Sequence, residues 1–121
     1  MLIRASLAAL IMFAACSSNP NTPDAATAAT VMAVTCPATP AASISADDNT
    51  LVYTPSTASI SVGQIVKFTM PSTHNVVPNA TMSDPGLVVN FNTTTCLMFT
   101  HAGTFGFHCG PHGFMGTITV Q

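Results

Sequence analysis

Residues 104–121, with the sequence TFGFHCGPHGFMGTITVQ, contain the pattern that decides the fold. Phe105, Phe107 and Cys109 occupy every second position, and successive side chains of a β-strand point to opposite faces of the sheet. The three side chains therefore share one face, which we expect to point into an apolar core. His108 has the opposite parity and is expected to point outward. The pattern predicts a strand that ends at a buried cysteine.

The whole segment from residue 31 to residue 121 has a sequence pattern typical of β-strands. Short runs rich in Val, Ile, Thr and Phe are separated by Pro, Gly, Asn and Asp, and no stretch shows a convincing helical period. A tight turn at Ala102-Gly103 separates two such runs, 96–100 and 104–107, which we expect to form an antiparallel hairpin. A chain of 121 residues has room for one compact domain, so we predict a single all-β sandwich over residues 31–121.

The loop that follows the predicted strand carries Cys109, His112 and Met115, with two residues between each pair. A thiolate, an imidazole and a thioether form a soft ligand set, which suits a copper ion that alternates between Cu(I) and Cu(II). The spacing C-x-x-H is weak by itself because zinc and haem sites use it too, but here strands lead into and out of the loop. A trigonal copper site needs a second histidine from elsewhere, and His74 is the candidate.

These motifs resemble those of the small cupredoxins, and the resemblance covers residues 51–120. It rests on Val62-Gly63, Val66-Lys67-Phe68, His74-Asn75-Val76, Gly103-x-Phe105-x-Phe107-x-Cys109-x-Pro111-His112 and Met115-Gly116. The ligand loop is most similar to the amicyanin type within the plastocyanin and pseudoazurin group. The resemblance implies a Greek-key β-sandwich of about seven to eight strands that holds one copper ion. His74, Cys109 and His112 would be the strong equatorial ligands. Met115 would be the long axial ligand.

Two features of the sequence depart from the pattern of the relatives. Gly110 stands where many of them have Ser or Thr, so we expect no side-chain hydrogen bond from this position to Asn75. The segment 36–53 matches their usual first strand poorly, which leaves the N-terminal edge of the sandwich undefined.

The function implied by the resemblance is single-electron transfer, without enzymatic activity or a small-molecule substrate. A bound thiolate leaves the cupric site with one net positive charge and the cuprous site neutral, so little reorganisation accompanies the electron. Two other functions stay open, namely copper trafficking or sensing and a purely structural domain. A His-Cys pair like His108-Cys109 also occurs in copper nitrite reductases, where the histidine beside the blue-copper cysteine binds a second, catalytic copper. That site needs three histidines, and only His101 is left here, so we expect His108 to be an ordinary outward-facing residue.

The exposed histidine of the loop, His112, is the expected exit for electrons. Redox partners are expected to dock transiently near His112 and Phe114, on an apolar surface that also includes Pro111, Gly113, Val77, Pro78 and Met82. The alternative is that Phe114 simply covers the end of the core. The chain has two basic and four acidic side chains. Nucleic acid is therefore excluded as a partner, because phosphate binding needs clustered Lys and Arg. We expect a monomer.

The N-terminus has the features of an export signal. Residues 1–16 read MLIRASLAALIMFAAC, with one Arg before an apolar run that is short for a membrane span. The end of this segment resembles a bacterial lipoprotein cleavage box, which would anchor Cys16 to a membrane by a lipid; ordinary signal cleavage is the alternative. Residues 17–30 are rich in Ser, Asn, Pro, Thr and Ala and read as a flexible tether, or as a frayed terminus without a role. We therefore expect a periplasmic or cell-envelope protein.

Four cysteines need assignments in an oxidising compartment. With Cys16 given to the lipid and Cys109 to the metal, Cys36 and Cys96 remain. A disulfide between them would close a loop of about 60 residues and stabilise the domain by on the order of 4 kcal/mol. Cys96 has the opposite parity from Leu97 and should lie on the outer face, where the N-terminal segment can cross it. Two free thiols or intermolecular contacts are the alternatives.

Overall fold

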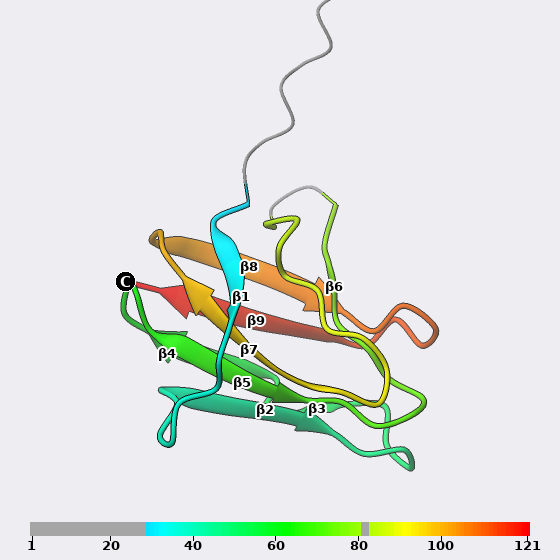
Figure 1. Ribbon diagram of the computed structural model, residues 1–121. Coiled ribbons are helices and arrows are strands. Elements are labelled where there is room, and N and C mark those ends of the chain that lie inside the picture. The colour runs from blue at the N-terminus through cyan, green and yellow to red at the C-terminus, as the bar shows by residue number, and fades with distance from the viewer. Residues whose placement is uncertain (1–28, 81–82) are drawn as a thin grey trace, which may run out of the picture.

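The computed structural model describes residues 29–80 and 83–121. Within these ranges all regular elements are β-strands, as Figure 1 shows. They are β1 (Val31–Val34), β2 (Ala42–Ala46), β3 (Tyr53–Thr54), β4 (Thr57–Ile60), β5 (Ile65–Thr69), β6 (Val77–Pro78), β7 (Thr94–Phe99), β8 (Gly103–His108) and β9 (Met115–Val120). The described ranges contain no helix long and apolar enough to span a membrane. The predictions for the export signal, for most of the tether and for Met82 lie outside the described residues.

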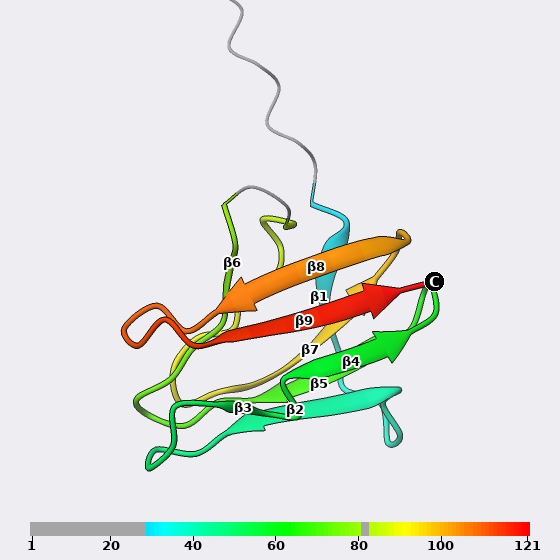
Figure 2. The ribbon, with the colours of Figure 1, turned by 180° about the vertical axis from the view of Figure 1, so that it is seen from behind.

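The nine strands form two sheets that pack face to face. One sheet has the order β1-β7-β5-β2-β3 and the other the order β4-β9-β8-β6. Figure 1 views the sandwich from the side of the first sheet, and Figure 2 views it from the side of the second. The pairs β2–β5 and β4–β9 are parallel, and the other pairs are antiparallel. The predicted all-β sandwich is confirmed. Residues 29–80 and 83–121 form nine strands, where about seven to eight were expected, and two of the nine, β3 and β6, are only two residues long.

One apolar core fills the space between the sheets. Phe68 of β5 and Phe107 of β8 come from opposite sheets, and their rings meet edge to face with centroids 5.7 Å apart. The alternation predicted for β8 is confirmed, because Phe105, Phe107 and Cys109 are all buried in this core. His108 lies on the other face of the strand, half-buried, where its Nδ1 is 2.7 Å from the side-chain oxygen of Asn79.

The prediction of a hairpin between β7 and β8 was wrong. β7 lies in the first sheet and β8 in the second, and the rings of Phe99 and Phe105 meet across the core at 5.3 Å. A strand has only two edges for hydrogen bonding, and both edges of β7 are taken, by β1 and by β5. The chain therefore crosses to the other sheet. Gly103 starts β8 with φ = 153°, a conformation that glycine adopts readily and other residues avoid.

The disulfide predicted between Cys36 and Cys96 is confirmed, with 60 residues of separation. Strand β1 pairs with β7 so that Val34 lies opposite Cys96, and this brings the following Cys36 within reach. Cys96 is buried but is not part of the apolar core between the sheets. Its side chain lies on the outer face of β7, under the N-terminal segment, as its parity predicted.

Asp84 joins the start of the folded domain to the loop before β7. Its carboxylate accepts hydrogen bonds from the backbone N–H of Thr30 at 2.6 Å, from the Thr30 hydroxyl at 2.7 Å and from the Gly86 N–H at 2.8 Å. Burial pulls the pKa of Asp84 upward, but the hydrogen bonds from Thr30 and Gly86 outweigh it, so the pKa lies below its ordinary value. The ionised carboxylate therefore stabilises the folded state.

We expect Asp84→Asn to lower the free energy of unfolding by about 1–3 kcal/mol at neutral pH, because an amide has one acceptor oxygen and turns its NH₂ toward the remaining donors. Urea titration would measure the loss. A group with a depressed folded pKa stabilises above its unfolded pKa and loses this effect as the pH falls through the folded pKa, so the difference from wild type should shrink in acid. Asp47→Asn, at an exposed position, is the matched control and should change stability by less than about 0.5 kcal/mol. Equal losses in the two variants would contradict the assignment.

Candidate metal centre

Three predicted ligands meet at one end of the sandwich. His74 lies in the loop between β5 and β6, Cys109 directly follows β8, and His112 lies in the loop between β8 and β9. These loops lie together at the right-hand end in Figure 1 and the left-hand end in Figure 2. The pairing of the strands places these loops at the same end of the sandwich. His74 and Cys109 therefore meet, although 35 residues separate them in sequence.

The three ligand atoms form a nearly regular triangle. His74 Nδ1 and His112 Nδ1 are 3.1 Å apart, and Cys109 Sγ is 3.6 Å from the first nitrogen and 3.7 Å from the second. A circle through the three atoms has a radius of about 2.0 Å, close to the bond lengths of about 2.0–2.3 Å that nitrogen and sulfur ligands make to a metal ion of this size. The three atoms thus have the spacing that would hold one metal ion. Among the described residues, it is the group of His, Cys, Asp or Glu side chains whose geometry suits a metal.

His74 is oriented by a hydrogen bond outside the triangle. Its side chain is 1% exposed, and its Nε2 lies 3.0 Å from the backbone carbonyl oxygen of Asp47. A carbonyl can only accept, so Nε2 carries the proton and Nδ1 keeps its lone pair for a metal. The backbone of the loop before β3 therefore selects the tautomer that a ligand needs.

The loop between β8 and β9 is closed by its own backbone. The Cys109 N–H donates to the Phe114 carbonyl at 3.0 Å, and the Gly113 N–H donates to the Cys109 carbonyl at 2.8 Å. Gly113 has φ = 73°, in the left-handed region that favours glycine. These contacts hold His112 close to Cys109, which is fully buried.

Asn75 joins the two ligand loops. Its side-chain oxygen accepts a hydrogen bond from the Gly110 N–H at 2.8 Å, and its carbonyl accepts one from the Tyr53 hydroxyl at 2.6 Å. The side-chain hydrogen bond that Gly110 cannot make is thus replaced by one from its backbone. Sequence reasoning missed Tyr53, although a single tyrosine in a poorly matched segment was a signal. Burial, with a smaller contribution from the nearby Cys109, raises the pKa of this hydroxyl above its ordinary range, so it stays a donor.

The charge at this end of the molecule is negative. Asp48 accepts hydrogen bonds from the Thr73 hydroxyl at 2.6 Å and from the Thr73 N–H at 3.1 Å. The side-chain hydrogen bond from Thr73 is the largest cause that holds the pKa of Asp48 below its ordinary value. Asp47, next to it, is also exposed, so two carboxylates lie on the loop beside His74.

Met115, the predicted axial ligand, turns its side chain to the solvent. Met115 is the first residue of β9, and its side chain is 65% exposed. Phe114 lies against the site instead, with its ring centroid 4.9 Å from the His74 ring and 6.4 Å from the His112 ring. Of the surface predicted around His112, Pro111 and Gly113 are exposed, Val77 and Pro78 are half-buried, and Phe114 packs against the core.

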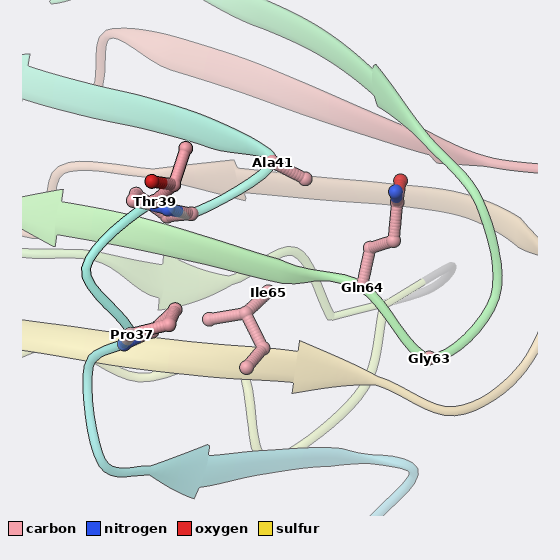
Figure 3. Close-up of a pocket in the computed structure, with 7 residues that line it drawn as sticks. Pro37, Thr39, Ala41, Gly63, Gln64 and Ile65 are labelled. Atoms are coloured by element: carbon pink, nitrogen blue, oxygen red, sulfur yellow. The ribbon is translucent and has the colours of Figure 1, made fainter.

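His101 and a surface pocket lie elsewhere. His101 is exposed just before β8, whereas Cys109 follows the far end of that strand. The shallow pocket in Figure 3 is lined by Pro37, Thr39, Pro40, Ala41, Gly63, Gln64 and Ile65. Gly63 donates a backbone hydrogen bond to Phe99 at the end of β7, which places the pocket at the end of the sandwich opposite the ligands. The pocket has no charged or metal-binding side chain in its lining.

A two-sheet sandwich that gathers two imidazoles and a thiol at one end defines the cupredoxins, a class of small copper proteins. The family model described as copper binding proteins of the plastocyanin/azurin family matches residues 40–121. The chain therefore belongs to this family, and its metal is one copper ion.

Solved amicyanin structures share the fold. Amicyanin from Paracoccus versutus (Thiobacillus versutus) is 16% identical, with a TM-score of 0.60 over 78% of this chain and 100% of that chain. A reduced Cu(I) form of an amicyanin mutant at pH 4 is 22% identical, with a TM-score of 0.60 over 76% of this chain and 99% of that chain. An oxidised amicyanin mutant is 26% identical, with a TM-score of 0.55 over 67% of this chain and 82% of that chain. The resemblance to the cupredoxins is thus confirmed.

Proposed function

We propose that the protein is a single-electron carrier with a mononuclear type 1 copper centre, whose strong ligands are His74, Cys109 and His112. The observation that carries the proposal is the triangle of Nδ1, Sγ and Nδ1 atoms, which already has the dimensions of a copper site. Copper, when bound, supplies the one-electron couple. The thiolate of Cys109 keeps the net charge of the site small in either oxidation state, which suits a buried position.

The residues around the triangle support fast electron transfer because they hold the ligands without help from the metal. The Asp47 carbonyl fixes the His74 ring, the Asn75 side chain ties Gly110 to the other loop, and the Cys109 backbone closes its own loop. A ligand set that does not rearrange between two oxidation states costs little reorganisation.

The path to partner proteins is proposed to run through His112. Cys109 and His74 are buried, whereas His112 is exposed, so it is the ligand that a partner can touch. Pro111 and Gly113 beside it are uncharged and exposed, which favours brief docking of redox partners near His112 and Phe114. The carboxylates of Asp47 and Asp48 lie at the same end and disfavour a partner with an acidic docking face.

Export and membrane attachment are also proposed, on the sequence of residues 1–30. In the described part of the chain, the hydrogen bonds of Thr30 to Asp84 fix the start of the folded domain. A tether between Cys16 and this point would let the domain move between partners on a membrane surface. Metabolic labelling with a fatty acid, compared between wild type and Cys16→Ala, would test the anchor.

Spectroelectrochemistry of the copper-loaded protein tests the carrier function. We expect an intense blue band that disappears on reduction, returns on oxidation over repeated cycles, and leaves the copper content unchanged after desalting. The three fixed ligands predict this retention, because loss of the metal requires the buried Cys109 and His74 to release it together. Rapid loss of Cu(I) to an acceptor apoprotein would favour copper trafficking instead. A colourless complex would contradict the type 1 site.

A further inference from the structure

The side chain that lies next to the ligand triangle is the hydrocarbon ring of Phe114, whereas the sulfur-containing side chain of Met115 is exposed. Phe114 is half-buried and packs against the core. Its ring is nearly parallel to the His112 ring, with an interplanar angle of 16°, and meets the His74 ring edge on at 84°. On its other side it contacts the Tyr53 ring, with centroids 4.6 Å apart. A phenyl ring has no lone pair to offer to a metal.

The register of β9 explains why Met115 is turned away. Gly116 lies opposite Phe107 in the ladder between β8 and β9, and a Cβ on Gly116 would come within 2.3 Å of the Phe107 ring. Gly116 therefore faces the core, together with Ile118 and Val120. Since successive side chains alternate, Met115 must face outward for as long as this register holds.

The backbone opposes a local rearrangement that would bring Met115 inward. Met115 is paired with His108 in the same ladder, and the Phe114 carbonyl accepts the hydrogen bond from the Cys109 N–H. Turning Met115 toward the triangle would break this arrangement and expel the Phe114 ring from its contacts with Tyr53 and His74. The three atoms alone have the dimensions of a trigonal site, so what distinguishes this site is the side chain that lies beside the triangle, which is Phe114.

We propose that the copper site has three protein ligands only, His74, Cys109 and His112, with Phe114 as a non-coordinating cover and Met115 outside the site. This inference rests on the proposed type 1 centre and replaces the axial role that the resemblance implied for Met115. The axial group tunes the potential of such sites. A donor sulfur stabilises the more highly charged cupric form, so its absence favours Cu(I) and raises the reduction potential. Phe114 is thus a residue that sets the potential without binding the metal.

Three matched variants test the proposal. We expect Met115→Leu to keep the absorption and electron paramagnetic resonance spectra of wild type, and to keep its ratio of reduced to oxidised protein at a fixed mediator potential. Phe114→Met offers a thioether where the ring now lies, and should lower that ratio by about tenfold or more. Phe114→Leu removes the ring without adding a donor, and should change the spectra far less than Phe114→Met.

X-ray absorption of the wild-type copper protein gives an answer that does not depend on any variant. We expect one short sulfur and two nitrogen neighbours, without a second sulfur. A second, long copper–sulfur distance, or a changed potential in Met115→Leu, would overturn the proposal and restore Met115 as a ligand. Failure of wild type to form a blue complex would be a different result, because it would overturn the type 1 centre itself.

Discussion

Cys109→Ser should abolish the intense blue colour of the copper-loaded protein. The colour of a type 1 site comes from charge transfer between the thiolate sulfur and Cu(II), and a serine hydroxyl is neither ionised at neutral pH nor an effective soft ligand. Cys109 supplies the sulfur atom of the triangle and is fully buried. Visible absorption during titration with cupric ion would measure the effect, and we expect the band to be lost rather than weakened.

Two controls make this result specific to the site. His101→Ala removes an exposed histidine at the opposite end of β8 and should keep the full colour. Circular dichroism of Cys109→Ser without copper should match wild type, because the buried hydroxyl has His74 and His112 nitrogens nearby as hydrogen-bond partners. An intense blue band in a folded Cys109→Ser variant would refute the assignment of this thiolate.

Removal of the disulfide should produce the largest loss of stability. We expect the double variant Cys36→Ser, Cys96→Ala to lose about 4 kcal/mol of unfolding free energy, from the entropy that the unfolded chain regains when a loop of this length is opened. Alanine suits the buried position 96 and serine the exposed position 36. A domain of this size is stable by roughly 5–15 kcal/mol, so this is a large fraction of the total. Guanidinium titration would measure it.

The disulfide and the copper site are expected to act independently. Cys96 lies on the outer face of β7, outside the core that Cys109 shares with Phe107. The double variant should therefore bind copper and turn blue while it remains folded. A reducing agent should lower the stability of wild type toward that of the variant and leave the variant unchanged. A loss below about 1 kcal/mol would show that the bond contributes little beyond the packing of β1 on β7.

The alternation of side chains between the two faces of a strand accounts for most of the correct predictions. It correctly placed Phe107 and Cys109 in the core and Cys96 on the outer face, because the direction of a side chain depends only on its parity within a strand. The same rule applied to β9 places Met115 outward, opposite to Gly116. The resemblance implied an axial role for Met115, and the proposed three-ligand site departs from the resemblance at this residue.

The pairing of strands was beyond the reach of local patterns. The runs that became β7 and β8 look like a hairpin in sequence, yet β7 is enclosed by β1 and β5, which come from much earlier in the chain. Whether an edge is free depends on every other strand of the sheet. The same holds for the hydrogen bond from Tyr53 to Asn75, which joins segments 22 residues apart.

The amino-acid sequence by itself predicted the class of the fold, Cys109 with His112 and His74 as candidate ligands, and the disulfide between Cys36 and Cys96. These follow from parity, spacing and the number of cysteines, which are local or countable properties. Only the tertiary structure decided which side chain lies beside the ligand triangle, next to His74 and His112. That choice depends on the register between β8 and β9, where the Phe107 ring accepts only a glycine opposite it, so that Phe114 faces the site and Met115 faces the solvent.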